Sequence, residues 1–208
     1  NARLPRDPQV RAATRSTVRV LGTACGLGIE GSGWVAGPGL VVTNAHVVAG
    51  EQDTTVQPQG NGPRYTAQAV WFDPKNDIAV LRAEGVRSLP PLRLFVNAPS
   101  GTSGAVIGYP ENGPLDVEAA RIGPTIEALS QDAYGRGPLR RKITTLRGLV
   151  RSGNSGGPVV DRRGRVLTTV FASSLARGQH TGYGVPDSVV ANALANAHGS
   201  VSTGPCTR

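Results

Sequence analysis

The first half of the chain alternates short apolar runs with stretches rich in polar residues, glycine and proline. The apolar runs are dominated by β-branched residues, which fit a pleated sheet, whereas glycine and proline favour turns. The pattern therefore predicts strands at residues 17–22, 31–37, 39–48, 64–73 and 77–84. A proline-rich stretch at residues 88–101 is predicted to be a crossing connection, because proline cannot donate to a sheet ladder.

A second set of apolar runs predicts further strands beyond this connection. They lie at residues 104–110, 115–123, 141–150, 157–161, 165–174 and 181–186. Residues 161–164, Asp-Arg-Arg-Gly, favour a hairpin turn between two of them. Many short strands at this spacing are typical of antiparallel barrels or sandwiches, not of a parallel α/β sheet. The pattern predicts an all-β fold with two antiparallel lobes.

Helical periodicity is found only near the C-terminus, at residues 187–199. Four apolar residues at helical spacing share one face there, namely Val190, Ala193, Leu194 and Ala197. Asp187 is placed to cap the start of this helix and Gly199 to terminate it. Residues 1–16 are polar and interrupted by proline, so they are expected to form an arm. The expected organisation is one domain made of an arm (1–16), two β lobes (17–98 and 99–186) and a C-terminal helix and tail (187–208).

Composition and charge narrow the class of protein. The chain has 208 residues, of which 38% are hydrophobic and 17% charged, enough for one medium domain with a real core. Its formal net charge is +8, but the basic residues are scattered, with modest clusters at 140–142 and 162–165. No aromatic residues interleave with them to stack on bases, so no nucleic-acid partner is expected.

No apolar run approaches the roughly 20 residues that span a bilayer, so the domain itself is not expected to contact a membrane. The chain begins at Asn1 without a signal-like segment. This start suggests a mature form or an excised domain of a longer protein.

Two cysteines, Cys25 and Cys206, lie near opposite ends of the chain. Two thiols without clustered histidines do not make a zinc site, and no metal or other cofactor is expected. The cysteines either remain free or form one disulfide that ties the C-terminal tail to the first lobe. Their even number and terminal position favour the disulfide, which would indicate an oxidising compartment.

Two glycine motifs match patterns of other enzyme classes, but their contexts do not. Residues 26–31, Gly-Leu-Gly-Ile-Glu-Gly, match the dinucleotide-binding pattern, yet residues 32–39 cannot begin the helix that would hold the pyrophosphate. Residues 153–157, Gly-Asn-Ser-Gly-Gly, match the nucleophile elbow of α/β-hydrolases, which also needs a helix directly after the serine. Pro158 and the two valines after it favour a strand instead. Neither a dinucleotide enzyme nor an esterase of that fold is expected.

Three polar residues next to predicted strands occur in an order that suggests nucleophilic catalysis. His46 lies where one apolar run ends, Asp77 opens another, and Ser155 lies in the glycine-rich loop. Serine alone is a poor nucleophile and needs an imidazole to take its proton and a carboxylate to orient that imidazole. Each residue taken singly is more often structural, but the three contexts together predict a triad.

The sequences Thr-Asn-Ala-His-Val-Val, Asn-Asp-Ile-Ala-Val-Leu and Gly-Asn-Ser-Gly-Gly-Pro-Val-Val around these residues resemble the active-site motifs of chymotrypsin-fold serine proteases of the HtrA-like branch. The resemblance extends from about residue 18 to residue 190. It implies two antiparallel β-barrels with the active site between them. It also implies a serine endopeptidase that needs no cofactor and hydrolyses protein or peptide substrates through an acyl-enzyme.

The composition and the terminal cysteines are further similar to the membrane-anchored acid-resistance serine proteases of mycobacteria. That similarity implies a place in the bacterial periplasm or cell envelope and a role in stress or acid resistance. It also implies a membrane-spanning portion elsewhere in the full-length chain.

The resemblance assigns roles to the matching residues. Ser155 would be the nucleophile, His46 the general base and then acid, and Asp77 the orienting carboxylate. The backbone N–H groups of Gly153 and Ser155, with the Asn154 peptide between them, would form the oxyanion hole. Asn154 replaces the aspartate that pairs with a new N-terminus in digestive proteases, so activity is not expected to need a free N-terminal amine.

The resemblance also indicates where substrate binds. Leu149, six residues before Ser155, is expected near the base of the primary specificity pocket, which favours an apolar residue before the scissile bond. Phe171, Ala172 and Ser173 are expected to form the strand that pairs with the substrate backbone. The rival hypothesis is a catalytically silent module on the same fold that binds protein or another polymer. The complete set of three triad residues argues against it.

Overall fold

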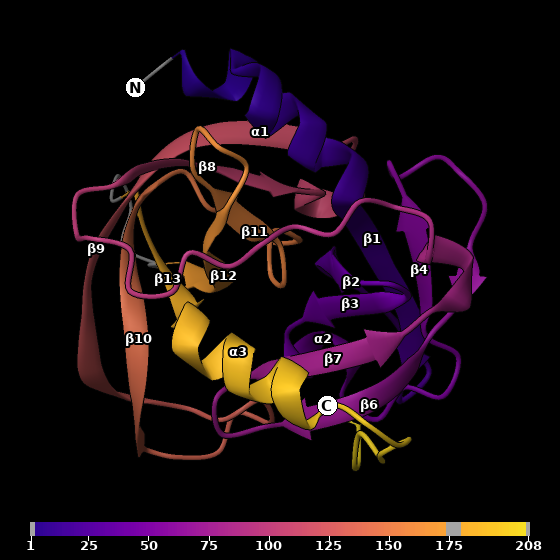
Figure 1. The fold of residues 1–208 in the computed structure, drawn as a ribbon. Coiled ribbons are helices and arrows are strands. Elements are labelled where there is room, and N and C mark those ends of the chain that lie inside the picture. The colour runs from indigo at the N-terminus through magenta and orange to yellow at the C-terminus, as the bar shows by residue number, and fades with distance from the viewer. Residues whose placement is uncertain (1–2, 174–179, 207–208) are drawn as a thin grey trace.

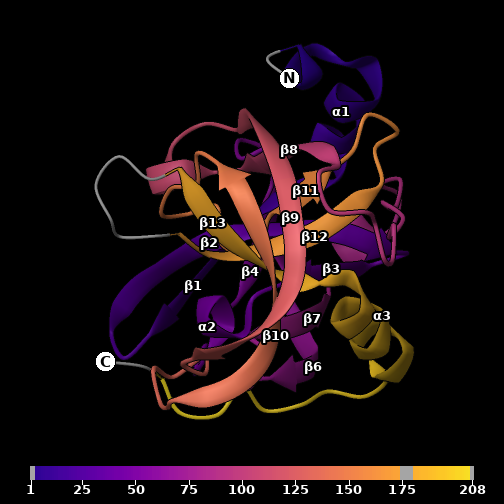
Figure 2. The ribbon, with the colours of Figure 1, turned by 90° about the vertical axis from the view of Figure 1, so that its left-hand side faces the viewer.

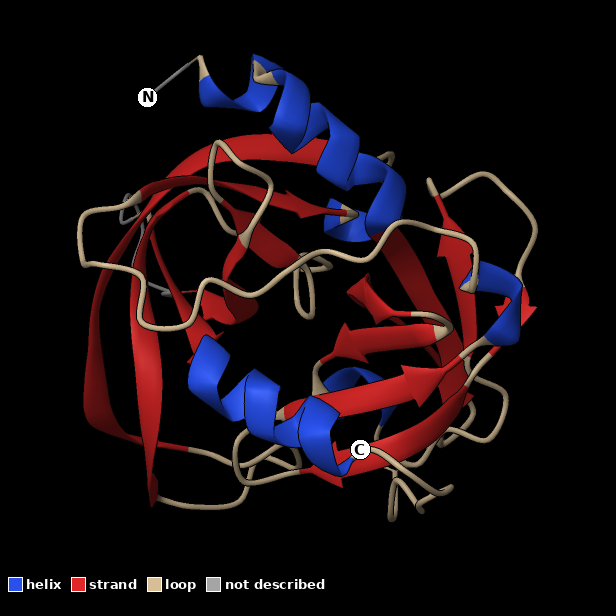
Figure 3. Ribbon diagram, viewed as in Figure 1, coloured by secondary structure: helices blue, strands red, loops and turns tan. Residues whose placement is uncertain are grey.

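A computed structural model describes residues 3–173 and 180–206 of the chain. Strands dominate it, and the helices are few and short (Figure 3). Two curled antiparallel sheets lie side by side, and the C-terminal helix α3 (Asp187–Asn196) packs against strands of both (Figure 1). The predicted all-β fold with two antiparallel lobes and a short C-terminal helix is confirmed.

The first lobe is a seven-stranded sheet in the order β5-β4-β1-β2-β3-β7-β6. Its strands are β1 (Thr17–Ala24), β2 (Leu27–Gly37), β3 (Leu40–Thr43), β4 (Thr55–Pro58), β5 (Tyr65–Thr66), β6 (Gln68–Asp73) and β7 (Ile78–Arg82). The sheet curls around a core made mostly of buried valine and alanine side chains. The short strand β4 was not predicted, because it offers only one fully buried side chain, Val56.

The second lobe is a closed barrel in the order β10-β13-β12-β11-β8-β9. Its strands are β8 (Ser103–Gly108), β9 (Asp116–Ser130), β10 (Leu139–Gly148), β11 (Pro158–Val160), β12 (Val166–Ser173) and β13 (Thr181–Pro186). The long strands β9 and β10 form a ribbon that extends past the barrel toward the first lobe (Figure 2). Strand β9 continues through Pro124 because the register shifts opposite Thr145, so no ladder hydrogen bond is required from the proline.

The two lobes share one apolar core. Residues of the first sheet such as Trp34 pack with residues of the second barrel such as Ile107, and with Val190 of helix α3. The Trp34 Nε1–H donates to Thr169 Oγ1 across the junction at 3.1 Å. Because a shared core does not slide freely, the residues that each lobe contributes to the junction are held in a fixed relation.

The predicted strand at 39–48 is wrong in its second half. Strand β3 ends at Thr43, and residues Ala45–Val48 form the single helical turn α2. Three of its four residues are apolar and buried, as they would also be in a buried strand. A short buried apolar run does not distinguish strand from helix by periodicity, which is why the turn was missed.

The segment from Leu4 to Ser16 is helical. It contains η1 (Leu4–Arg6), α1 (Pro8–Ala13) and η2 (Thr14–Ser16). The Asp7 side chain accepts a hydrogen bond from the Gln9 N–H and Pro8 follows it, a favourable start for helix α1. Leu4 and Val10 are buried in the shared core, so this segment packs on the protein.

Helix α3 carries the predicted apolar face, with Val190 and Ala193 buried and Leu194 half-buried, while Ala197 is buried just beyond the end of the helix. Its predicted cap is wrong. Asp187 is the first helical residue, after Pro186, and its carboxylate makes no capping hydrogen bond. The helix ends at Asn196 rather than at Gly199. None of the helices in residues 3–173 and 180–206 has the length and apolar character needed to cross a membrane.

The hairpin predicted at residues 161–164 is confirmed between β11 and β12. The Gly164 N–H donates to Asp161 O, and Gly164 takes a φ of +72°, which glycine adopts without strain. The Asp161 carboxylate accepts from three donors of Arg165, the backbone N–H, Nε and Nη2.

A disulfide joins Cys25 to Cys206, with the Cα atoms 5.7 Å apart, so the alternative of two free thiols is wrong. The tail before Cys206 runs along the first lobe. The Val201 N–H donates to Ala69 O at 2.9 Å, and Thr203 O accepts from the Gly50 N–H at 3.2 Å.

Glu51 lies beside this tail with only 7% of its surface exposed. One carboxylate oxygen, Oε2, accepts a hydrogen bond from Thr54 Oγ1 at 2.6 Å, while Oε1 has no partner among the described residues. Burial, together with the nearby charge of Asp53, raises the pKa of Glu51 to about 7, despite the opposing hydrogen bond from Thr54. The folded protein therefore holds this proton more tightly than the unfolded chain does.

Glu51→Gln is expected to stabilise the protein at pH 8 and to leave its stability unchanged at pH 4. When a carboxyl group has a higher pKa in the folded protein than in the unfolded chain, stability is lost as the pH rises from the unfolded pKa to the folded pKa. Glutamine has nearly the same shape and stays neutral, so about 1–2 kcal/mol is expected at pH 8, allowing for solvent screening. Urea unfolding at both pH values measures this, with Glu84→Gln as an exposed control. An equal difference from the parent at both pH values would contradict the prediction.

Candidate active site

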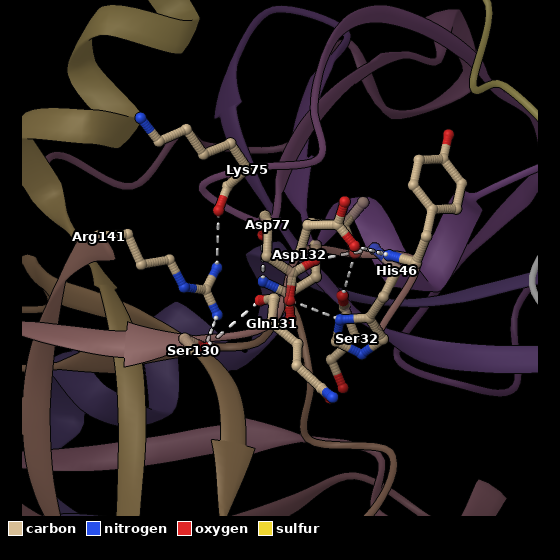
Figure 4. Close-up of polar contacts among 11 residues, drawn as sticks. Ser32, His46, Lys75, Asp77, Ser130, Gln131, Asp132 and Arg141 are labelled. Atoms are coloured by element: carbon tan, nitrogen blue, oxygen red, sulfur yellow. Dashed lines mark hydrogen bonds and ion pairs between the residues drawn. The ribbon is translucent and has the colours of Figure 1, made fainter. Parts of the chain in front are cut away.

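His46 and Asp77 are brought together by the ends of two neighbouring strands. Strand β3 leads into the turn α2 that carries His46, and Asp77 immediately precedes β7, which pairs with β3. The His46 Nδ1 lies 2.7 Å from Asp77 Oδ2, and the His46 backbone N–H donates to Asp77 Oδ1 at 2.8 Å (Figure 4). A proton on Nδ1 leaves Nε2 as the free base, so the arrangement fixes both the tautomer and the ring orientation.

Asp77 is held by its backbone as well. It has a φ of +56°, the left-handed region that is uncommon outside glycine. The Asn44 side chain, just before α2, donates to Asp77 O at 2.9 Å. The preceding turn is closed by the Asp73 carboxylate, which accepts from the backbone and side chain of Asn76. Sequence reasoning missed Asn44, although its place two residues before His46 is a signal.

His46 and Asp77 shift each other's pKa. Burial lowers the pKa of His46, but the charge of Asp77 and its hydrogen bond raise it more, so the net shift is upward. Burial raises the pKa of Asp77, but His46 and the positive charge of Arg141 lower it further than burial raises it. Asp77 is thus held as an anion against Nδ1 of an imidazole that keeps 35% of its side chain exposed.

The glycine-rich loop that carries Ser155 is shaped by its backbone. Gly153 and Gly156 have φ values of +88° and +84°, where a side chain would be strained. The loop is closed by a hydrogen bond from Gly157 N–H to Asn154 O at 2.9 Å. It is joined to strand β12 by a hydrogen bond from Gly156 N–H to Val170 O at 2.8 Å.

Contacts from outside the loop orient its peptide groups. The Glu111 N–H donates to Ser152 O at 2.8 Å, and the Ser32 hydroxyl donates to Gly153 O at 2.7 Å. In a trans peptide the N–H points opposite to the C=O, so the first of these bonds turns the Gly153 N–H to the other side. Among the described residues, neither the Gly153 N–H nor the Ser155 N–H has an acceptor.

Ser32 was not predicted as part of the site. It is completely buried in β2, and its hydroxyl also accepts from the Tyr109 N–H at 3.0 Å, while its own N–H donates to Ser155 O at 2.8 Å. One residue of the first lobe therefore holds the loop of the second at two carbonyl oxygens. The sequence placed Ser32 in the predicted strand at 31–37, but nothing local indicates that its hydroxyl contacts a loop more than a hundred residues later.

The loop lies against the strand end that leads to His46. A Cβ atom at Gly156 would collide with Ser32 O and Thr43 Oγ1 and would lie 3.1 Å from Asn44 N. Within the described part of the chain no hydrogen bond joins Ser155 to the His46 ring. Such bonds are often long before a substrate binds, so the absence of this one does not argue against Ser155 as a nucleophile.

The residues expected to contact substrate lie around this loop. Leu149 is half-buried in the segment between β10 and the loop, and Phe171 is half-buried on β12. Ala172 and Ser173 continue β12, paired in register with Tyr183 and Gly182 of β13. The side chains of Ala172 and Ser173 lie outside the part that the structure describes. In residues 3–173 and 180–206 no three His, Cys, Asp or Glu side chains are grouped to hold a metal ion.

Known proteins share this sequence pattern. A trypsin-like peptidase domain matches residues 31–167. The serine protease Rv3671c of Mycobacterium tuberculosis is 38% identical over 98% of this chain and 52% of its own length. Protease Do-like 2, chloroplastic, of Arabidopsis thaliana is 28% identical over 85% of this chain and 30% of its own length. The chain thus spans about half or less of the length of these curated relatives.

Solved structures share the fold. The active form of the Rv3671c protease from M. tuberculosis superposes with a TM-score of 0.91 at 35% identity, covering 100% of this chain and 92% of that one. An inactive form of the same protease gives a TM-score of 0.80 at 34% identity, covering 96% and 97%. The backbone of this chain is therefore more similar to that active form than to that inactive form.

Proposed function

The chain belongs to the trypsin-like peptidase family, and from that premise we propose that it is a serine endopeptidase with Ser155, His46 and Asp77 as its catalytic residues. The observation that carries the proposal is the two-point contact of His46 with Asp77 beside a serine loop whose two N–H donors have no acceptor within the described residues. A binding module on the same fold would have no need for a buried carboxylate that fixes one histidine tautomer.

In the proposed reaction the Ser155 hydroxyl attacks the scissile carbonyl carbon while His46 Nε2 takes its proton. Asp77 stabilises the imidazolium that forms, since it stays ionised and hydrogen-bonded to Nδ1. His46 then gives the proton to the leaving amine, which departs and leaves an acyl group on Ser155. A water molecule, deprotonated by the same histidine, releases the acid and restores the enzyme.

The negative charge that develops on the substrate oxygen would be held by the Gly153 and Ser155 N–H groups. Such donors act in the transition state, and each is worth about 10²–10³ in rate. The Gly153 N–H shares its peptide with Ser152 O, which accepts from the Glu111 N–H, and the Ser155 N–H shares its peptide with Asn154 O, which accepts from the Gly157 N–H, so these two hydrogen bonds orient the donors. The closer likeness of the whole backbone to the active form of the Rv3671c protease supports an overall arrangement of the two lobes like that of an active protease.

Substrates in this proposal are proteins or peptides of the bacterial cell envelope or periplasm. The disulfide supports an oxidising compartment, and the relative of M. tuberculosis supports a bacterial protease lineage. Processing of proteins during stress or acid exposure, by a longer chain with a membrane-spanning portion, is proposed from the family resemblance. Leu149 near the specificity pocket favours an apolar residue before the cut, and Phe171, Ala172 and Ser173 would pair with the substrate backbone.

The proposal is tested by labelling with a serine-directed fluorophosphonate. We expect the folded protein to be labelled on Ser155, as located by mass spectrometry of the peptide that contains residues 152–157. Only an activated serine reacts at neutral pH, because an ordinary hydroxyl is a poor nucleophile. Heat-unfolded protein and Ser155→Ala should not be labelled, whereas Ser152→Ala, an exposed serine of the same loop, should be labelled normally.

Two outcomes would contradict the proposal. Folded parent protein that stays unlabelled and leaves a denatured proteome uncut would favour the silent binding module. Labelling that persists in Ser155→Ala would place the nucleophile elsewhere.

A further inference from the structure

Arg141 is a buried charge that the proposed reaction does not explain. It lies on β10 with only 6% of its surface exposed, and none of the carboxylates in the described residues lies within ion-pair distance of it. Its Nε has no hydrogen-bond partner in that part of the chain. Burying a cation without a direct counter-ion costs free energy, so some compensating role is to be expected.

The guanidinium reaches from the second lobe to the turn that presents Asp77. Its Nη1 donates to Lys75 O at 3.3 Å, two residues before Asp77, and its Nη2 donates to Ser130 Oγ at 3.1 Å (Figure 4). Its Cζ lies over the Phe171 ring, 4.2 Å from the ring centroid. One planar group thus contacts the Asp77 turn and the strand expected to bind substrate.

A neighbouring contact supports the same link between the lobes. The loop that joins β9 to β10 donates from the Ala133 N–H to Pro74 O at 2.8 Å, next to the carbonyl that Arg141 binds. Tyr134 of that loop lies against the Phe72 ring, with centroids 6.2 Å apart. The turn before Asp77 is therefore held from the second lobe at two successive carbonyl oxygens.

We propose that Arg141 is a positioning residue that holds the Asp77 turn against the second lobe and so aligns Asp77 and His46 with the loop that carries Ser155. The proposal rests on the proposed function, since it concerns the same triad. It goes beyond that function by naming a residue that touches neither substrate nor the reacting atoms. Through its contact with the Phe171 ring, the same guanidinium also supports the strand expected to pair with substrate.

The positive charge of Arg141 supports the triad as well as its hydrogen bonds do. The charged groups near it are Asp77, Asp73 and Asp132, all acidic. Its positive charge lowers the pKa of Asp77 and also lowers the pKa of His46, where burial and Asp77 are the larger influences. Arg141 therefore favours an ionised carboxylate and a neutral imidazole, the protonation states that the reaction needs.

The test compares Arg141→Met, Arg141→Lys and Ser130→Ala with Arg140→Met, a control on the exposed neighbour in the same strand. We expect Arg141→Met to lower kcat by roughly 10–100-fold with little change in KM, because a misplaced catalytic group affects the chemical step. The acidic limb of its kcat/KM profile should move to higher pH, since the pKa of His46 rises when the cation is lost. Arg141→Lys should keep the limb of the parent while losing part of kcat, and Ser130→Ala should lose less.

All rates are divided by the folded fraction measured by circular dichroism at the assay temperature. If Arg141→Met and Arg140→Met agree in kcat and in pH profile after this correction, the inference is wrong. If Arg141→Met does not fold, Arg141→Lys and Ser130→Ala decide the matter, and parent-like kcat in both overturns it. Failure of the proposed function is distinct, because the parent itself would then remain unlabelled by fluorophosphonate.

Discussion

Replacing Ser155 by alanine is expected to lower kcat by about 10⁶ and to leave KM nearly unchanged. Alanine cannot form the acyl-enzyme, so only attack by water on the bound substrate remains. The loss corresponds to about 8 kcal/mol of transition-state stabilisation. The activity that survives reflects substrate binding and the Gly153 and Ser155 N–H donors, which the substitution leaves in place because they belong to the backbone.

His46→Ala is expected to cost about as much, and the double variant hardly more. The serine and the histidine act in one proton transfer, so removing either partner removes the whole contribution. Steady-state kinetics on a fluorogenic peptide with an apolar residue before the scissile bond measure all three variants. Ser152→Ala serves as the matched control, because it changes an exposed hydroxyl of the same loop and keeps the Ser152 carbonyl that Glu111 binds.

The result would contradict the triad in two ways. Single variants that keep more than about a hundredth of the parental kcat would show that another group is the nucleophile or the base. Losses that add in the double variant would show that Ser155 and His46 do not act in the same step.

The sequence predicted the lobes and provided the candidate triad because both depend on local patterns. Valine-rich runs and turn residues indicate strands wherever they occur, and the contexts of His46, Asp77 and Ser155 each lie within a few residues of the chain. The helical turn α2 was missed because a buried apolar segment looks the same as strand or helix. The packed N-terminal helices were missed because Leu4 and Val10 are buried only by elements much later in the chain.

The supporting residues of the site could not be predicted for the same reason. Ser32 lies 121 positions from Gly153, whose carbonyl it holds, and Arg141 lies 66 positions from Lys75. The local pattern does not reveal either role, since Ser32 stands in a predicted strand with no partner indicated and Arg141 resembles a surface arginine in a basic cluster. Their roles depend on how the two lobes meet, and that geometry depends on the shared core rather than on any motif.

Removing the disulfide is expected to destabilise the protein by about 3–5 kcal/mol. Cys25 and Cys206 are 181 positions apart, so the cross-link closes nearly the whole chain into one loop. On the chain-entropy account such a loop is worth about 5 kcal/mol, because it removes conformations from the unfolded state. The observed loss should be somewhat smaller, since an unfolded chain is more compact than the account assumes.

The tail itself should stay in place in the disulfide-free protein. Hydrogen bonds from Gly50 and Tyr134 to Thr203 O, and from Val201 to Ala69 O, hold it along the first lobe without the covalent bond. The expected loss of stability therefore comes mainly from the greater conformational freedom of the unfolded chain, not from a change in the folded protein. The folded active site should remain intact, and the fluorophosphonate labelling rate of folded protein should change little.

Thermal and urea unfolding of the Cys25→Ala/Cys206→Ala variant measure the effect, which corresponds to roughly 10 °C or more in Tm for a domain of this size. Parent protein unfolded with a thiol reductant should match the variant, and the single Cys25→Ala variant should match the double. If both variants and the reduced parent have the same Tm and urea midpoint as the oxidised parent, the cross-link does not constrain the unfolded chain. The entropic account then fails for this protein. A different result would be that the folded fraction of the variant loses fluorophosphonate labelling along with stability. In that case the disulfide acts on the folded active site, and the inference from the Thr203 contacts that it acts on the unfolded chain alone is wrong.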